Sequence, residues 1–83
     1  MRPTGALNDA PLEIELLVIA VDLDPVVTSW IEAVGVAVGD RLSVLRRAAF
    51  GGPLHVRSVR GGEFAIDRSV AAHIHVERVE NGA

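Results

Sequence analysis

Four glycines frame the central part of the chain and fix where it can turn. Gly35 and Gly39 precede a β-like run over Arg41–Phe50, and Gly51-Gly52-Pro53 follows it. Glycine reaches backbone conformations that other residues avoid, and proline cannot continue a central strand. The sequence therefore predicts that residues 41–50 form a long strand and that the neighbouring segments fold back on it.

Alternation of apolar and polar residues predicts strands on both sides of this run. The expected strands cover Pro11–Val21, Arg41–Phe50, Leu54–Arg60, Glu63–Ile66 and His73–Val79. Gly61-Gly62 predicts a two-residue hairpin between the third and the fourth. Inward-facing side chains are expected at Leu42, Val44, Ala48, Phe50, Leu54, Val56, Phe64, Ile66, Ile74 and Val76.

Two helical segments are expected. Asp24 is a good N-cap, Pro25 suits the first helical position, and Gly35 suits the position just beyond the last turn. The side chains between them recur at helical spacing and predict one apolar stripe, Trp30 included, that faces the sheet. A single helical turn through residue 72, capped by Asp67 or Ser69, is expected before the last strand.

Composition limits how the core is built. Hydrophobic residues make up 49% of the 83 residues and aromatics only 4%, so Val, Ile, Leu and Ala must fill it. There is no cysteine, which excludes disulfides and thiolate metal sites. The chain is expected to be mostly β: a small, partly orthogonal barrel of about five strands, with one α-helix after the first strand. We expect a flexible lead-in over residues 1–10, one domain over 11–80 and a tail over 81–83.

The sequence offers little for catalysis. It has no cysteine nucleophile, and Gly35 and Gly39 lack the Gly-Lys-Ser/Thr ending of a phosphate-binding loop. We therefore expect no enzyme activity. The longest apolar run, Leu16–Val21, is far shorter than the roughly 20 residues that span a bilayer. A cytoplasmic protein without direct membrane insertion is expected.

His73, His75 and Glu77 form the one pattern with metal-ligand spacing. Alternate residues of a strand project on one face, about 6–7 Å apart, which is close enough to share one ion. These residues are either weak ligands for Fe²⁺ or Zn²⁺ or an ordinary polar face of the last strand. No cofactor is required in either case.

Charge and apolar residues also mark a candidate interaction surface. The net charge is −6 over residues 1–40 and +3 over residues 41–83. Arg46, Arg47, Arg57 and Arg60 form either one basic patch or a solvated sheet face. The segment between Arg47 and His55 is unusually apolar for a turn, and Phe50 either marks an interaction site or folds into the core. The dispersed aromatics and negative net charge argue against nucleic-acid binding.

The order of these elements resembles the FeoA family, which accompanies the bacterial ferrous-iron transporter FeoB. Trp30-Ile31-Glu32-Ala33-Val34-Gly35 stands where that family has Arg-Leu-x-x-Leu-Gly, and Val38-Gly39 stands where it has Pro-Gly. The strand and turn over residues 44–54 fit closely, and Phe64–Val76 resembles the closing segment of the family. The resemblance implies an SH3-like barrel.

The resemblance also implies a function. It points to a non-enzymatic accessory protein of ferrous iron uptake that binds the cytoplasmic side of FeoB, at its G domain or membrane stem. The residues assigned to that contact are Arg46, Arg47, Phe50, Gly51, Gly52, Pro53, Leu54 and Arg57. The alternative is a stand-alone metal-binding or metal-sensing module, similar to the C-terminal domain of iron-dependent repressors, with His73, His75 and Glu77 as ligands.

Overall fold

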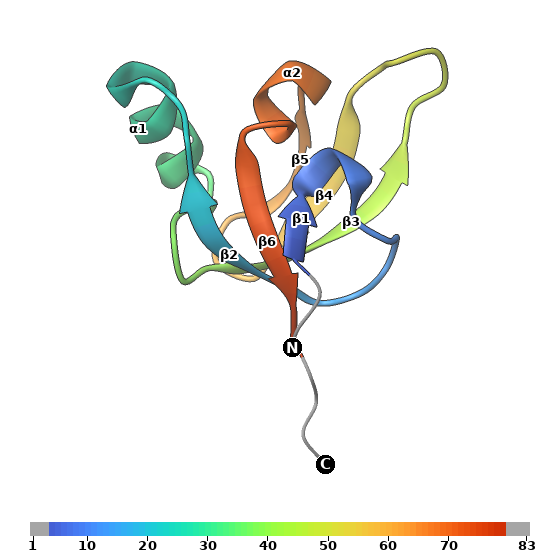
Figure 1. The fold of residues 1–83 in the computed structure, drawn as a ribbon, viewed down its shortest axis with the longest axis horizontal. Coiled ribbons are helices and arrows are strands. Elements are labelled where there is room, and N and C mark those ends of the chain that lie inside the picture. The colour runs from blue at the N-terminus through green and yellow to red at the C-terminus, as the bar shows by residue number, and fades with distance from the viewer. Residues whose placement is uncertain (1–3, 80–83) are drawn as a thin grey trace.

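A six-stranded antiparallel sheet bends around one apolar core in the computed structural model, which describes residues 4–79 (Figure 1). The strand order is β1-β6-β2-β3-β4-β5, so β1 and β5 are its edges. The elements are β1 (Thr4–Ala6), the 3-10 turn η1 (Leu7–Asp9), β2 (Leu16–Val21), α1 (Pro25–Ala33), β3 (Arg41–Arg47), β4 (Leu54–Ser58), β5 (Gly62–Ile66), α2 (Arg68–Ala71) and β6 (Ile74–Arg78). The expected mostly-β architecture is confirmed, with one helix after β2 and a short helical turn before the last strand.

The expected flexible lead-in is wrong for residues 4–10. β1 pairs with β6, where Ala6 lies opposite His75, and the Leu7 side chain is completely buried. The described part of the sheet therefore has six strands rather than about five. A three-residue strand is too short to show alternation, so only its partner β6 reveals it. Residues 1–3 and the expected tail over 81–83 lie outside the described residues.

The first expected strand, Pro11–Val21, begins later than predicted. β2 starts at Leu16, and residues 11–15 cross towards β3 instead of running along the sheet. Leu12 makes an isolated bridge to Val44, and the Glu13 amide donates to the Val44 carbonyl at 2.8 Å. Glu13 has a φ of 56°, in the left-handed region, so the extended run is broken there.

Helix α1 begins and ends where its local signals predicted. One carboxylate oxygen of Asp24 accepts from the amides of Val26 and Val27 at 3.0 and 3.1 Å. Beyond the last turn, Gly35 has a φ of 102°. Both ends are set by residues within one turn of the helix, which is why the sequence was sufficient to place them.

The end of α1 is fixed to the turn between β4 and β5. The buried Ser58 hydroxyl donates to the Gly35 carbonyl at 2.7 Å and accepts from the amides of Arg60 and Gly61 at 3.3 and 3.2 Å. Gly62 pairs with Ser58, so the connection is Val59–Gly61 rather than the expected two-residue Gly61-Gly62 turn. This contact ties the helix to the sheet at one end.

The core is aliphatic, as the composition required. Its fully buried apolar members come from strands, loops and α2: Leu7, Val18, Val36, Leu42, Val44, Leu54, Val56, Ala71 and Ile74. Phe64 is partly buried against this cluster. The expected inward positions of β3, β4, β5 and β6 are therefore confirmed, apart from Ala48 and Phe50.

Two aromatic side chains are exposed although the helical and strand periods assigned them to inward faces, and for Phe50 this excludes the alternative in which it folds into the core. Trp30 is 76% exposed, although the helical period assigned it to the stripe that faces the sheet. α1 buries only Ile31, and both Val26 and Trp30 are left exposed. Phe50 is fully exposed because the register of β3 shifts between Val44 and Arg46 and the strand ends at Arg47. The alternation of inward and outward side chains that holds up to Val44 therefore does not predict the orientation of residues 48 and 50.

Candidate functional site

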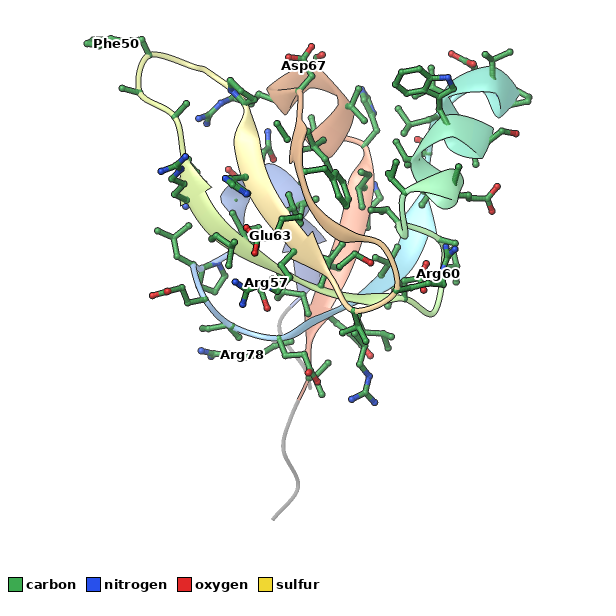
Figure 2. All side chains as sticks on the ribbon, turned by 180° about the vertical axis from the view of Figure 1, so that it is seen from behind. Phe50, Arg57, Arg60, Glu63, Asp67 and Arg78 are labelled. Atoms are coloured by element: carbon green, nitrogen blue, oxygen red, sulfur yellow. The ribbon has the colours of Figure 1, made fainter. Side chains whose placement is uncertain are left out.

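The loop between β3 and β4, residues 48–53, projects from the sheet and carries an aromatic side chain at its tip. Phe50 points away from the rest of the molecule in Figure 2, and its backbone φ of 57° lies in the left-handed region. Only a few per cent of residues other than glycine adopt this conformation, and bulky residues pay most for it. The backbone therefore presents Phe50 to solvent rather than folding it into the core.

Hydrogen bonds hold this loop in one shape. The Ala48 amide donates to the Pro53 carbonyl at 3.0 Å, and the Gly52 amide donates to the Ala49 carbonyl at 3.2 Å. From α2, the Arg68 guanidinium donates to the carbonyls of Gly52 and Ala48 at 3.3 and 3.4 Å. The loop is thus closed by its own backbone and braced from a neighbouring element.

Two of the residues assigned to a partner contact, Leu54 and Arg47, have different roles in the structure. Leu54 is fully buried and belongs to the core, so it cannot line a contact surface. Arg47 is half-buried and donates to the backbone carbonyls of Asn8, at 2.9 Å, and Ala10. It fastens the N-terminal segment to β3. Arg46 is exposed beside the loop, while Gly51, Gly52 and Pro53 form its turn.

Arg57 lies on the outer face of the β4–β5 hairpin, in an ion-pair cluster separate from the loop (Figure 2). Its guanidinium is 3.1 Å from the Glu63 carboxylate, and His55 Nε2 is 3.2 Å from the other oxygen of that carboxylate. The hydrogen bond from Arg57 and its positive charge hold the pKa of Glu63 below its ordinary value. The charge of Arg57 is therefore already partnered within the hairpin.

Arg60 is engaged in the same way at the end of α1. It donates to the Asp40 carboxylate at 2.8 Å and to the Glu32 carbonyl at 2.7 Å. This hydrogen bond lowers the pKa of Asp40, and the ion pair raises the pKa of Arg60. The four arginines, which the sequence allowed as either one basic patch or a solvated sheet face, are thus spread over separate contacts. Arg46 alone of the four is exposed beside the loop without an ion pair to any residue between 4 and 79.

The expected metal ligands lie at the end and along the length of β6. His73 is exposed in the turn before β6, and His75 and Glu77 are half-buried on the strand. Within residues 4–79, no three His, Asp or Glu side chains are arranged to hold a metal ion together. The sequence pattern is present, but its three members are not gathered into one coordination site.

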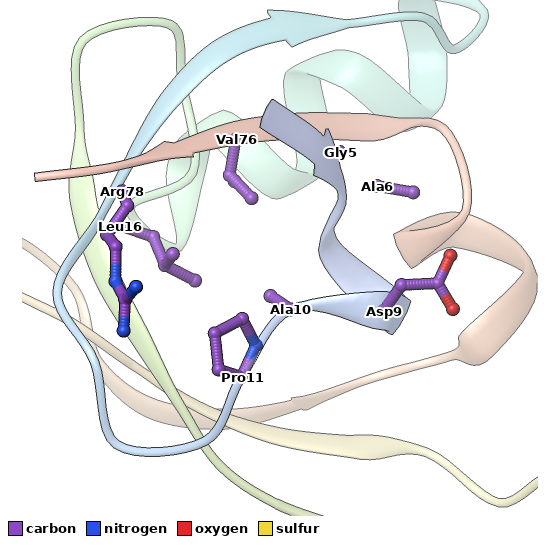
Figure 3. A pocket seen from close by; sticks show the side chains of 8 residues that line it. All are labelled: Gly5, Ala6, Asp9, Ala10, Pro11, Leu16, Val76 and Arg78. Carbon is purple, nitrogen blue, oxygen red and sulfur yellow. The ribbon is translucent and has the colours of Figure 1, made fainter. Parts of the chain in front are cut away.

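A hollow of about 250 Å³ lies beside the N-terminal segment (Figure 3). Most of its wall is apolar, and its two charged residues, Asp9 and Arg78, stand on opposite sides. No nucleophile and base face each other in its lining, which gives no arrangement for acyl or phosphoryl transfer.

A second surface was missed by the sequence reasoning. An apolar groove of about 390 Å³ runs between α1 on one side and β5 with α2 on the other. Trp30 and Val34 form one wall, and Phe64 and Val70 belong to the other. The signal in the sequence was the width of the apolar stripe on α1, which exceeds what a helix packed at the rim of a small barrel can bury.

Taken together, the fold and its loop define a small SH3-like domain with a braced, aromatic-tipped loop rather than an enclosed active site. The family model for the FeoA domain matches residues 6–78, and the chain belongs to the FeoA family. This family is associated with ferrous iron transport. No curated protein is significantly similar to the chain in sequence.

Solved structures show the same fold. The FeoA protein from Chlorobium tepidum is 26% identical over 94% of this chain and 73% of its own, with a TM-score of 0.82. A FeoA-like protein from Clostridium acetobutylicum is 24% identical over 100% and 95% of the two chains, with a TM-score of 0.79. A manganese-dependent transcriptional repressor is 21% identical over 95% of this chain but 44% of its own, with a TM-score of 0.82. The SH3-like fold expected from the family resemblance is confirmed.

None of the helices in residues 4–79 has the length and apolar character that a membrane crossing requires.

Proposed function

We propose that this protein is a non-enzymatic accessory protein of bacterial ferrous iron uptake that works in the cytoplasm and binds the cytoplasmic side of a FeoB-type transporter. The observation that carries the proposal is the fully exposed Phe50 at the tip of a braced loop, in a chain of the FeoA family. An aromatic side chain held in water by its own backbone is typical of an anchor that is buried on binding.

The neighbourhood of Phe50 supports the same contact. Arg46 adds an exposed positive charge beside the loop, and Pro53 limits the conformations that the loop can adopt. A loop that is already ordered loses little conformational entropy on binding. We infer that Phe50 and Arg46 are the main contact residues, and that Gly51, Gly52 and Pro53 set the shape of the loop.

The test is a titration of the purified protein against the detergent-solubilised FeoB-type transporter from the same source, with and without guanine nucleotide. Saturable binding is expected. Phe50→Ala should weaken it by about tenfold or more, as the loss of a buried aromatic anchor does. Val59→Ala is the matched control, because Val59 is another exposed apolar residue at a different turn. Arg46→Glu should also weaken binding, and the loss of affinity should be larger at low salt than at high salt.

Two results would count against the proposal. One is the absence of binding in every nucleotide state. The other is binding that Phe50→Ala and Arg46→Glu leave unchanged, which would place the contact elsewhere on the protein.

A second candidate function is a metal-binding or metal-sensing module, and the similarity to the repressor fold favours it. Its candidate ligands are His73 and His75, which are accessible at least in part, because the full set of His73, His75 and Glu77 is not gathered into one site. An Fe²⁺ or Zn²⁺ titration monitored by calorimetry tests it. Loss of binding in the His73→Ala, His75→Ala double variant would support this function, and unchanged affinity would remove it.

A further inference from the structure

The apolar groove between α1 and β5 is bounded by an unpaired strand edge. β5 ends the strand order, and among the described residues its only strand partner is β4. In Figure 2 the other side of β5 faces α1. Phe64, Ala65 and Ile66 of this strand line the groove. A free strand edge offers a row of backbone donors and acceptors to any extended segment beside it.

The opposite wall of the groove supplies apolar contacts. Trp30 of α1 and Val34, which follows its last residue, are exposed along it, and Val27 of α1 is half-buried. Because successive residues of a strand point to opposite sides, an extended segment laid on β5 would direct every second side chain towards one of these walls. A segment with apolar residues at alternate positions would therefore match both the edge and the wall.

The charges around the groove favour one sign of charge on the bound segment. Among residues 4–79, Asp67 is the only ionisable residue that lines the groove. Arg68 follows it in sequence, but its guanidinium donates to the carbonyls of Gly52 and Ala48 in the other direction. Residues 22–34, which include α1, carry Asp22, Asp24 and Glu32 and no basic residue. A positively charged residue in the segment would be attracted here, and a negative one repelled.

We propose that this groove binds an extended segment of a partner protein by strand addition to β5, and that the segment alternates apolar residues and carries at least one Arg or Lys. The inference does not depend on the proposed function, because the groove and the β3–β4 loop share no residue. One protein can thus hold two contacts at once, an anchor loop and a strand-binding groove.

A second copy of this chain is a poorer occupant than a basic segment. Antiparallel pairing of two β5 edges, centred on Ala65, would place Glu63 of one copy opposite Asp67 of the other. Like charges directly opposite each other destabilise a strand pair.

The probe is a displayed library of random peptides of about twelve residues, selected on the folded chain alone. Enriched peptides are then titrated into isotope-labelled protein and followed by NMR. We expect the shared pattern to alternate apolar residues with Arg or Lys. We also expect shifts at the amides of Glu63–Ile66 and at the Trp30 indole, with slower amide exchange along β5.

Matched variants complete the test. Trp30→Ala should weaken binding by about tenfold, whereas Val26→Ala should not change it. Both residues lie on α1 and are about equally exposed, at 76% and 75%, but only Trp30 lines the groove. Asp67→Asn should weaken binding of the basic peptides more at low salt than at high salt.

Four outcomes would overturn the proposal. They are a selection that yields no peptide tighter than about 1 mM, enriched peptides that bind equally to Trp30→Ala, peptides that leave β5 exchange unchanged, and wild-type self-association that Trp30→Ala abolishes. The last outcome would identify a second copy as the occupant.

Discussion

Gly61 packs against the Val34 carbonyl so closely that a Cβ at position 61 would lie 1.7 Å from that oxygen. This contact joins the end of α1 to the β4–β5 turn, beside the buried hydroxyl of Ser58. The orientation of the helix, and with it one wall of the groove, therefore depends on a residue that has no side chain.

Replacing Gly61 with alanine should destabilise the protein by about 3 kcal/mol, because backbone rather than a flexible side chain must move to make room. Denaturant unfolding measures the loss. Gly5→Ala is the control, since its Cβ meets nothing within 4 Å and the stability should change by less than about 0.5 kcal/mol. Equal effects at both positions would contradict the packing described.

Truncating Leu54 should destabilise the protein, whereas truncating Phe50 should leave its stability nearly unchanged. Leu54→Ala removes a fully buried side chain and should cost about 2–5 kcal/mol in the free energy of unfolding. Phe50→Ala removes a fully exposed one and should change stability by less than about 0.5 kcal/mol. Thermal and denaturant unfolding of the two variants provide the measurement. A destabilised Phe50→Ala protein would show that this side chain packs into the core.

Arg47 and Arg46 are neighbours in sequence, but replacing them should change the stability of the protein by different amounts. Arg47→Met leaves the carbonyls of Asn8 and Ala10 without their donor and should cost about 1–3 kcal/mol. Arg46→Met should cost less than about 0.5 kcal/mol, because Arg46 is exposed. Amide exchange over residues 4–10 provides a local readout. It should accelerate in Arg47→Met and stay unchanged in Arg46→Met.

The Asp40–Arg60 ion pair should appear in the acid range of the stability curve. The hydrogen bond from Arg60 lowers the pKa of Asp40 in the folded state, whereas the unfolded chain keeps the ordinary value, about 3.9. The folded state therefore holds the charged carboxylate better, and this contribution is fully present above about pH 5. It is lost as the pH falls through the lowered pKa.

Asp40→Asn should consequently be less stable than the wild type at pH 7, and the two stabilities should converge as the pH falls through the lowered pKa of Asp40. Urea unfolding at several pH values measures the difference. Glu63 also has a lowered pKa and is present in both proteins, so its contribution cancels. A stability difference that stays constant from pH 7 to the acid range would rule out the ion pair as its cause.

Local signals made much of the fold predictable. The Asp24-Pro25 start of α1, the glycine after its last turn and the alternation of Leu54 and Val56 act within a few residues, so each could be interpreted without its neighbours in space. The short strand β1 and the break at Glu13 could not be predicted in this way. They depend on pairing with β6 and β3, which are distant in sequence.

The candidate site was predictable in part. The sequence identified the apolar, glycine-containing loop and its tip residue, because composition alone distinguishes it from an ordinary polar turn. It also grouped Arg46, Arg47 and Arg57, which the structure separates into an exposed charge, a backbone clamp and an ion pair. Spacing along a strand does not show which arginine meets a carboxylate and which meets a carbonyl.

Most of the helices and strands, the aliphatic core and the family could be read from the sequence alone, because capping, alternation and turn residues act locally and appear in order along the chain. The exposure of Trp30 and Phe50 and the free edge of β5 beside an apolar wall emerged from the folded structure. Burial depends on how closely elements that are distant in sequence approach one another. A helical period or a strand alternation specifies a face, but the packing of the whole chain decides whether that face is covered.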